Sequence, residues 1–149
     1  MLRVVLKFKK LDKCGKLGSY RFKGDAGLDL YSIEGVTINP GESIWVRTGL
    51  AVEIPRRYVG FIKEKSSLAQ AFTVGAGVID SAYRGEVKVC VRNLTDRKLK
   101  IKKGQAIAQL VILPFVSVKT REILQLSLTK RGKRGLGSQR LSTRVAFLL

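Results

Sequence analysis

Two aspartates stand where a carboxylate could take part in chemistry. Asp29 lies between two leucines in the segment AGLDLYS, and Asp80 comes three residues after Gly77, just ahead of a turn. A carboxylate held at the edge of a hairpin can act as the base for a water molecule. Tyr83 follows Asp80 and offers a ring that can pack against a sugar. Taken alone, Asp29 also fits a surface turn, and Asp80 an ordinary Asx-type turn.

The chain has no histidine, and this absence excludes several chemistries. Neither a Ser-His-Asp nor a Cys-His nucleophile system can form, and a His-ligated zinc site is excluded. The two cysteines, Cys14 and Cys90, cannot hold zinc by themselves, and they suggest a reducing compartment. Any acid–base step therefore falls to Asp, Glu, Lys, Tyr or Cys.

Two segments carry groups that bind phosphate. Lys65, Ser66 and Ser67 stand at the start of a short helix predicted over 67–72, with Ser66 as its N-cap, where hydroxyls and backbone N–H groups can hold an anion. An ordinary helix N-cap explains the same serines. The segment RGKRGLGS, residues 131–138, combines cations with glycines that let the backbone approach a ligand. It lacks the ending of a P-loop, and a basic tail that binds nucleic acid fits it as well.

The charge indicates an anionic partner. The chain of 149 residues has 29 Lys and Arg against 11 Asp and Glu, a formal charge of +18. Such a charge favours nucleic acid, an anionic surface or a phosphorylated small molecule. A hydrophobic content of 45% argues against disorder, and the length fits one domain.

The dominant hydrophobic period is two, which predicts strands. Apolar and polar residues alternate over 2–8, 44–54, 87–91, 99–101 and 124–128, and 107–113 is apolar except for Gln109. Turn signals separate the runs at 39–41, 55–57, 93–96 and 103–104. Short strands with such turns predict an all-β sandwich or barrel with at most one short helix.

The C-terminal end differs from the rest. No acid follows Glu122, and the six later cations give this stretch +6. We predict a β-barrel domain over 1–129 and a mobile, basic, glycine-rich tail over 130–149. The start shows no signal peptide and no segment is long enough to span a membrane, so we expect a cytoplasmic or nuclear protein, not a secreted one.

The order of these segments resembles a known family. AGLDLYS, KSSLA, GAGVIDSAYRGE, GQAIAQL and RGKRGLGS follow one another as do the five motifs of the trimeric dUTPases, with GVIDSAYRGE the most specific. The resemblance covers residues 2–138. It implies a jelly-roll-like (β-clip) subunit in a homotrimer, with three active sites between subunits. It also implies hydrolysis of dUTP to dUMP and pyrophosphate with Mg²⁺.

The resemblance also implies roles for individual residues. Asp80 would orient and deprotonate the attacking water, and Asp29 would hold the hydrated Mg²⁺. Tyr83 would stack on the deoxyribose and exclude a 2′-hydroxyl. The remaining substrate-binding positions are Lys65, Ser66, Ser67 and Gln109 for the phosphates, Gly77 and Val78 in the hairpin that reads uracil, and Arg131, Leu136, Gly137 and Ser138 in the closing tail.

Three positions depart from the family pattern. Lys65 stands where Arg is usual, so the charge is kept but the planar fork is lost. Leu136 replaces an aromatic residue, which removes a stacking surface and predicts weaker closure of the tail. Ser138 is followed by Gln and Arg in place of the usual Thr and Gly.

Two alternatives stay open at this point. A dCTP deaminase shares the fold, but Cys90 stands where that family has its catalytic glutamate. A non-catalytic regulatory or nucleic-acid-binding protein would explain the charge and the altered tail. Non-specific association with nucleic acid is also predicted as a side property of the enzyme.

Overall fold

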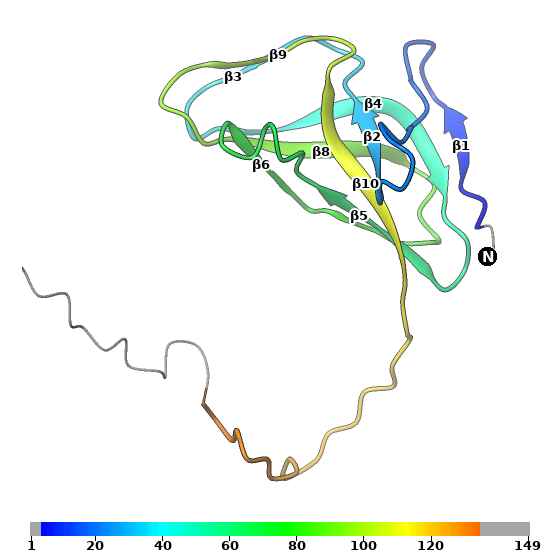
Figure 1. The fold of residues 1–149 in the computed structure, drawn as a ribbon, viewed down its shortest axis with the longest axis vertical. Helices are drawn as coiled ribbons and strands as arrows, with labels where there is room; N and C mark the ends of the chain where they lie inside the picture. The colour runs from blue at the N-terminus through cyan, green and yellow to red at the C-terminus, as the bar shows by residue number, and fades with distance from the viewer. Residues whose placement is uncertain (1–3, 135–149) are drawn as a thin grey trace, which may run out of the picture. The chain divides into compact units, whose positions relative to one another are not determined.

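The computed structural model describes residues 4–134, which form β-strands and no helix (Figure 1). The strands are β1 (Lys7–Lys10), β2 (Gly27–Tyr31), β3 (Val36–Ile38), β4 (Ser43–Glu53), β5 (Tyr58–Lys63), β6 (Phe72–Gly75), β7 (Val78–Ile79), β8 (Glu86–Asn93), β9 (Leu99–Ile101) and β10 (Ala106–Pro114). This arrangement confirms the all-β, jelly-roll-like fold that the alternation predicts.

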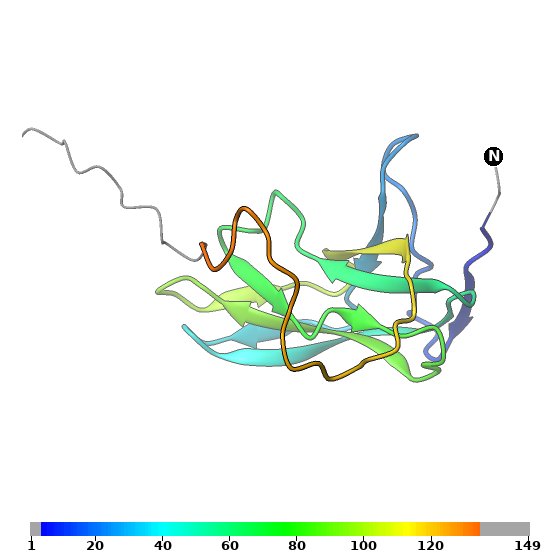
Figure 2. The same ribbon diagram turned by 90° about the horizontal axis from the view of Figure 1, so that it is seen from below.

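The strands form two four-stranded sheets and one two-stranded sheet. The orders are β1-β4-β8-β6, β2-β10-β5-β7 and β3-β9. Figure 2 shows the strands stacked in layers, and one apolar core lies between them. Every sheet contributes to this core, for example through Phe72 on β6, Leu110 on β10 and Ile101 on β9, each at most 2% exposed.

The period-two pattern decides which side chains enter the core. On β8, Val87, Val89 and Val91 are fully buried, whereas Lys88 and Arg92, which point to the opposite face, are exposed to solvent. Successive side chains of a strand point to opposite faces, so the valines line the core and the cations form the outer surface.

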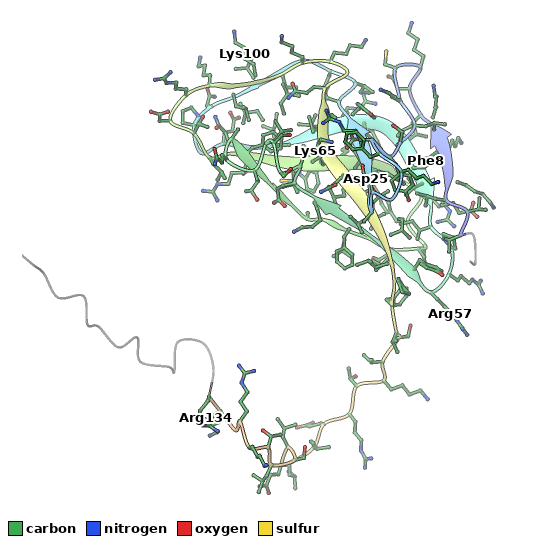
Figure 3. The ribbon with its side chains drawn as sticks, viewed as in Figure 1. Phe8, Asp25, Arg57, Lys65, Lys100 and Arg134 are labelled. Atoms are coloured by element: carbon green, nitrogen blue, oxygen red, sulfur yellow. The ribbon has the colours of Figure 1, made fainter. Side chains whose placement is uncertain are left out.

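Each predicted turn signal marks a connection between strands. Gly41 and Gly104 have φ of 72° and 79°, in the left-handed region that glycine enters without steric cost. The turn between β4 and β5 instead places Arg57 there, with φ of 70°. The Arg57 side chain points away from the sheets (Figure 3).

Two predicted elements are wrong, and one is shorter than expected. Of the predicted helix 67–72, residues 67–71 form turns and Phe72 begins β6, because six residues are too few to nucleate a stable helix and Phe72 is needed in the core. Residues 124–128 are exposed and not a strand, since alternation fixes the faces of a strand but supplies no partner. The alternation over 2–8 yields a strand only from Lys7 onward, and residues 1–3 lie outside the described part.

The chain divides into two compact units, Met1–Ser117 and Val118–Leu149. The first contains all ten strands of the described residues. Within residues 4–134, no helix has the length and apolarity needed to cross a membrane.

Candidate functional site

The pairing of three strands brings together residues that are far apart in the sequence. Strand β10 lies between β2 and β5, and its Gln109 is opposite Asp29 on one side and Lys63 on the other. The chain leaves β5 at Lys63 and continues into Glu64 and Lys65. Asp29, the carboxylate of the predicted motif AGLDLYS, therefore lies beside Lys65, the cation of the predicted motif KSSLA.

Asp29 and Lys65 form a largely buried ion pair. The ammonium of Lys65 donates a hydrogen bond to Oδ1 of Asp29, and the two side chains are only 15% and 12% exposed. Two charges taken out of water stabilise each other only while both are present, so removing either one leaves an unpaired buried charge. Figure 3 shows Lys65 within the packed strands, in contrast to Lys100 on β9, which points outward.

Gln109 positions the segment that carries Lys65. Its Nε2 donates to the carbonyl oxygen of Glu64 at 2.9 Å. A Cβ on Gly27 would lie 2.3 Å from Oε1 of Gln109, so glycine at 27 makes room for this amide. The residue predicted to contact phosphate thus fixes the backbone just before Lys65.

Glu64 is a positioning residue that sequence reasoning missed. Its Oε1 accepts hydrogen bonds from the Thr73 hydroxyl at 2.7 Å and from the Val74 N–H at 3.1 Å. These bonds, the Thr73 hydroxyl first, lower the pKa of Glu64 from 4.5 to about 2. A glutamate between two lysines looks like a solvated charge in the sequence, and only the fold shows that it ties the segment after β5 to β6.

Ser66 and Ser67 lie exposed on the turn that follows Lys65. The Leu68 N–H closes this turn on the Lys65 carbonyl at 2.8 Å. Because no helix forms here, a helix dipole adds nothing. The capacity to bind an anion comes from the two hydroxyls, the local backbone N–H groups and the Lys65 charge.

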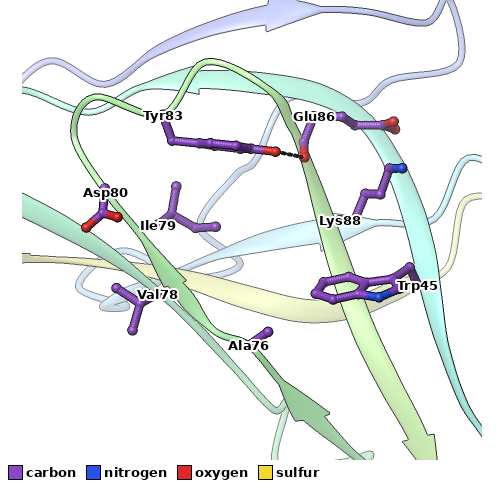
Figure 4. A pocket seen from close by; sticks show the side chains of 8 residues that line it. All are labelled: Trp45, Ala76, Val78, Ile79, Asp80, Tyr83, Glu86 and Lys88. Carbon is purple, nitrogen blue, oxygen red and sulfur yellow. Dashed lines mark hydrogen bonds between the residues drawn. The ribbon is translucent and has the colours of Figure 1, made fainter.

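A second group of predicted residues surrounds a cavity of about 520 Å³ beside residues 76–88, which run from the end of β6 through β7 into β8. The predicted hairpin is wrong as a paired unit, because β7 pairs with β5 whereas β8 pairs with β4 and β6; we keep the name hairpin for the segment 76–88 only. Asp80 stands on the connection between β7 and β8, and the Tyr83 ring lies across the opening with its hydroxyl donating to the Glu86 carbonyl at 3.1 Å (Figure 4). The lining residues are Trp45, Ala76, Val78, Ile79, Asp80, Tyr83, Glu86 and Lys88.

Two glycines shape this hairpin. Gly77 accepts a hydrogen bond from the Ile62 N–H at 2.7 Å, and a Cβ at 77 would lie 2.6 Å from the Ile62 carbonyl oxygen. A Cβ on Gly85 would lie 2.4 Å from the Tyr83 hydroxyl. Close approach of β7 to β5, and of the tyrosine to its own turn, requires glycine at both positions.

Glu86 lines the cavity, but its carboxylate is already engaged. It accepts hydrogen bonds from Nε of Arg47 at 3.2 Å and from the Gly49 N–H at 2.8 Å. The Glu86 hydrogen bond and charge raise the pKa of Arg47. Cys90, further along β8, lies opposite Trp45 and offers no carboxylate. The hairpin therefore lacks a free glutamate of the kind that a deaminase needs.

The two groups of residues do not meet within one chain. None of Asp29, Lys65, Ser66, Ser67 and Gln109 lines the hairpin cavity. Ile79 pairs with Gly60, which places Asp80 beside Val59, six residues before Lys65. At the rise of an extended strand this corresponds to about 15–20 Å, more than the triphosphate of one nucleotide spans.

The comparisons with known proteins agree with this geometry. The family model described as dUTPase matches residues 15–139. The chain belongs to the dUTPase family. It is 42% identical over 137 residues to the deoxyuridine 5′-triphosphate nucleotidohydrolase of Trichodesmium erythraeum, covering 89% of this chain and 96% of that protein. It is 45% identical over 137 residues to the same enzyme of Nautilia profundicola, with coverage of 89% and 96%.

Solved dUTPase structures share the fold. The dUTPase of Staphylococcus bacteriophage 80alpha with dUPNHPP superposes with a TM-score of 0.84 at 28% identity, covering 90% of this chain and 97% of that one. A variant dUTPase from phage phi11 of S. aureus, described with a structural Mg(II) ion, superposes with a TM-score of 0.77 at 24% identity, covering 83% and 99%.

The other substrate-binding residues that the dUTPase motifs predict belong to the motif RGKRGLGS, residues 131–138. Arg131 is exposed, and its Nε donates to the Arg134 carbonyl at 2.9 Å. Leu136, Gly137 and Ser138 lie outside the described residues, and their predicted contacts with substrate stay predictions.

A metal ion would find few protein ligands in this dUTPase. Within residues 4–134, no three His, Cys, Asp or Glu side chains cluster so that they could hold one. Asp29 offers a single carboxylate, of which Oδ1 is occupied by Lys65. This donor set fits Mg²⁺, which keeps several waters and binds mainly to substrate phosphates. It does not fit a cation that needs a protein cage.

Gly77→Ala should disturb the hairpin cavity, whereas Gly75→Ala should not. The new methyl at 77 would press on the Ile62 backbone, and at 75 the nearest atom is the Cys90 sulfur at 3.8 Å. We expect Gly77→Ala to lower the free energy of unfolding by about 1–3 kcal/mol, as overpacking does, and to weaken nucleotide binding. Urea denaturation and calorimetry with a dUTP analogue measure both. Equal losses of stability and of nucleotide binding in Gly77→Ala and Gly75→Ala would contradict the close contact at Gly77 as the cause.

Glu64 should make stability depend on pH in the acid range. Its pKa in the folded state, about 2, lies below its ordinary value of 4.5, so its stabilising effect is present above pH 4.5 and is lost as the pH falls toward 2. We expect Glu64→Gln to remove about 1–2 kcal/mol of this acid-induced loss of stability. Denaturation curves at several pH values test this, with the exposed Glu122→Gln as control. Parallel pH profiles for wild type and Glu64→Gln would refute it.

Proposed function

We propose that the protein hydrolyses dUTP to dUMP and pyrophosphate. The observation that carries the proposal is the hairpin cavity, where Asp80 and Tyr83 stand in the most specific motif of a chain 42% identical to a named dUTP nucleotidohydrolase. A water molecule attacks the α-phosphorus, and the bond to the bridging oxygen of the β-phosphate breaks. The water oxygen remains on dUMP, and pyrophosphate leaves with the electron pair of the broken bond.

Asp80 is the proposed base. It stands exposed at the rim of the cavity and is not engaged in an ion pair within residues 4–134, so its carboxylate is available to a water. It takes the proton as the water attacks, a contribution of roughly 10²–10⁴-fold in rate. The chain has no histidine to replace it in this role.

The hairpin selects the nucleoside. Tyr83 is held by its bond to the Glu86 carbonyl, so its ring is a fixed wall against which a deoxyribose packs and a 2′-hydroxyl does not fit. Val78 lines the cavity, and Gly77 directly precedes it. We assign recognition of the polar edge of uracil to backbone N–H and C=O groups of this segment.

The second group of residues binds the phosphates. Lys65, Ser66, Ser67 and the backbone of their turn provide a positive charge and hydrogen-bond donors for phosphate oxygens. Gln109 and Glu64 hold this turn in place through their bonds to it and to β6. Because Lys65 is a point charge rather than a planar fork, it contacts phosphate without the bidentate geometry of arginine.

Asp29 would hold Mg²⁺ through water. When bound, Mg²⁺ withdraws negative charge from the phosphate oxygens. The pair with Lys65 orients Asp29 beside the phosphate-binding turn.

The active enzyme is a homotrimer in this proposal. The separation of Asp80 from Lys65 along the β5–β7 ladder supports it, because each site then combines the hairpin of one subunit with the phosphate-binding turn of another. Residues 130–149 form the tail that closes over the site, with Arg131 on the γ-phosphate and Leu136, Gly137 and Ser138 over the nucleotide. The free thiols of Cys14 and Cys90 support a cytoplasmic or nuclear location.

Asp80→Asn should abolish most of the turnover, since the amide cannot accept a proton from water. We expect a loss of about 10²–10⁴-fold in pyrophosphate release from dUTP with Mg²⁺. Asp96→Asn, at a carboxylate 90% exposed, is the matched control and should retain full activity. The wild type should prefer dUTP over UTP, dCTP and dTTP. Ammonia release from dCTP, or no turnover of dUTP, would overturn the proposal.

Two inactive variants should complement each other if the sites are shared between subunits. Asp29→Asn/Lys65→Met removes both charges of the buried pair, and Asp80→Asn removes the base. Co-refolded subunits should recover about a quarter of wild-type activity, because random assembly makes about one site in four intact. Sedimentation would confirm that mixed trimers form. Mixed trimers without activity would contradict the shared site.

A further inference from the structure

Much of the positive charge has no role in the proposed catalysis, and part of it gathers between β1 and β2. Residues 13–23 contain Lys13, Lys16, Arg21 and Lys23 and no acid. Figure 2 shows the connection between β1 and β2 extending away from the stacked sheets. We refer to residues 13–23 as the aromatic–basic loop.

The acids that flank this loop leave its cations without partners. Asp12 accepts a hydrogen bond from the Cys14 N–H at 2.8 Å, and Asp25 accepts one from the Phe22 N–H at 2.9 Å. Both carboxylates therefore close turns of the backbone. Within residues 4–134, no ion pair involves any cation of the loop.

Two large aromatic rings are exposed among these cations. Tyr20 is 55% exposed and Phe22 is 66% exposed, and neither belongs to the core. The Arg21 guanidinium lies 5.5 Å from the centroid of the Phe22 ring. The bond between Phe22 and Asp25 fixes the turn, so the rings are presented at little cost in conformational entropy.

The surface continues from the loop onto neighbouring strands. The ammonium of Lys16 lies 3.9 Å from the centroid of the Tyr31 ring at the end of β2, and the Tyr31 hydroxyl lies 3.4 Å from Ser19 Oγ. The side chain of Cys14 raises the pKa of the Lys103 ammonium, on the turn before β10. Cations and aromatic faces therefore alternate along one surface.

We propose that the aromatic–basic loop binds single-stranded nucleic acid. A single strand offers what this surface requires, a row of phosphates for the cations and unpaired bases that stack on exposed rings. A duplex presents phosphates but keeps its bases stacked within the helix, so the rings would gain nothing from it. An acidic protein surface would match the positive charge of the loop, but it offers no planar bases on which Tyr20 and Phe22 could stack.

The experiment measures binding of a fluorescent oligo(dT) and of the matching duplex by anisotropy over a range of salt concentrations. Oligo(dT) contains no uracil, and the readout needs no turnover, so a failure of the proposed dUTP hydrolysis would not change the result. We expect the single strand to bind more tightly than the duplex. Equal or tighter binding of the duplex would overturn the proposal.

Two double variants separate stacking from charge. Tyr20→Ala/Phe22→Ala should weaken binding by about 5- to 100-fold for each ring that stacks on a base, with an unchanged salt dependence. Arg21→Gln/Lys23→Gln should make the slope of log K against log salt shallower by about 1.4, since each phosphate contact on a single strand contributes about 0.7.

Lys98→Gln/Lys100→Gln is the matched control, because it removes the same charge from exposed positions at and beside β9. It should leave affinity for oligo(dT) close to that of the wild type. All three double variants should hydrolyse dUTP normally, which shows that they fold. If the control weakens binding as much as Arg21→Gln/Lys23→Gln, or if loss of the rings has no effect, the loop is not the binding surface.

Discussion

The buried ion pair between Asp29 and Lys65 is the constraint on which the proposed phosphate-binding half of the site depends. It joins β2 to the segment after β5, and it is stable only because Gln109, Gly27 and the sheet register hold both partners in place. Neither charge is free in the absence of nucleotide. In the proposed mechanism, a phosphate that draws Lys65 toward itself would release Asp29 to Mg²⁺, so that nucleotide and Mg²⁺ would each favour binding of the other.

The distance between this pair and Asp80 makes the proposed active site depend on assembly of subunits. Strand β5 separates Asp80, the proposed base, from the proposed phosphate-binding turn, and β7 cannot shift along β5 without breaking the close contact at Gly77. In this proposal, one chain carries halves of two different sites. In the proposed trimer, the geometry of the reaction is set by contacts between subunits.

The positive charge divides into parts with different environments. Lys65 is buried and paired, and Arg47 holds Glu86 at the base of the hairpin, so both act within the fold. The cations of residues 13–23 are exposed and lack acidic partners in the described part of the chain. Exposed charge contributes little to stability and much to attraction of anions, which is the reason to assign it to binding.

The sequence by itself determined the strands of the core, the turns between them and the residue types of the site, because alternation and turn chemistry are local properties. It could not show that Gln109 binds the Glu64 carbonyl, that Glu64 ties its segment to β6, or that Glu86 is engaged by Arg47. It also predicted a helix over 67–72 and a strand over 124–128, where the local pattern had no packing partner to support it. Only the tertiary structure decided these points, since each depends on which strands pair and in which register, and such pairing joins residues far apart in the chain.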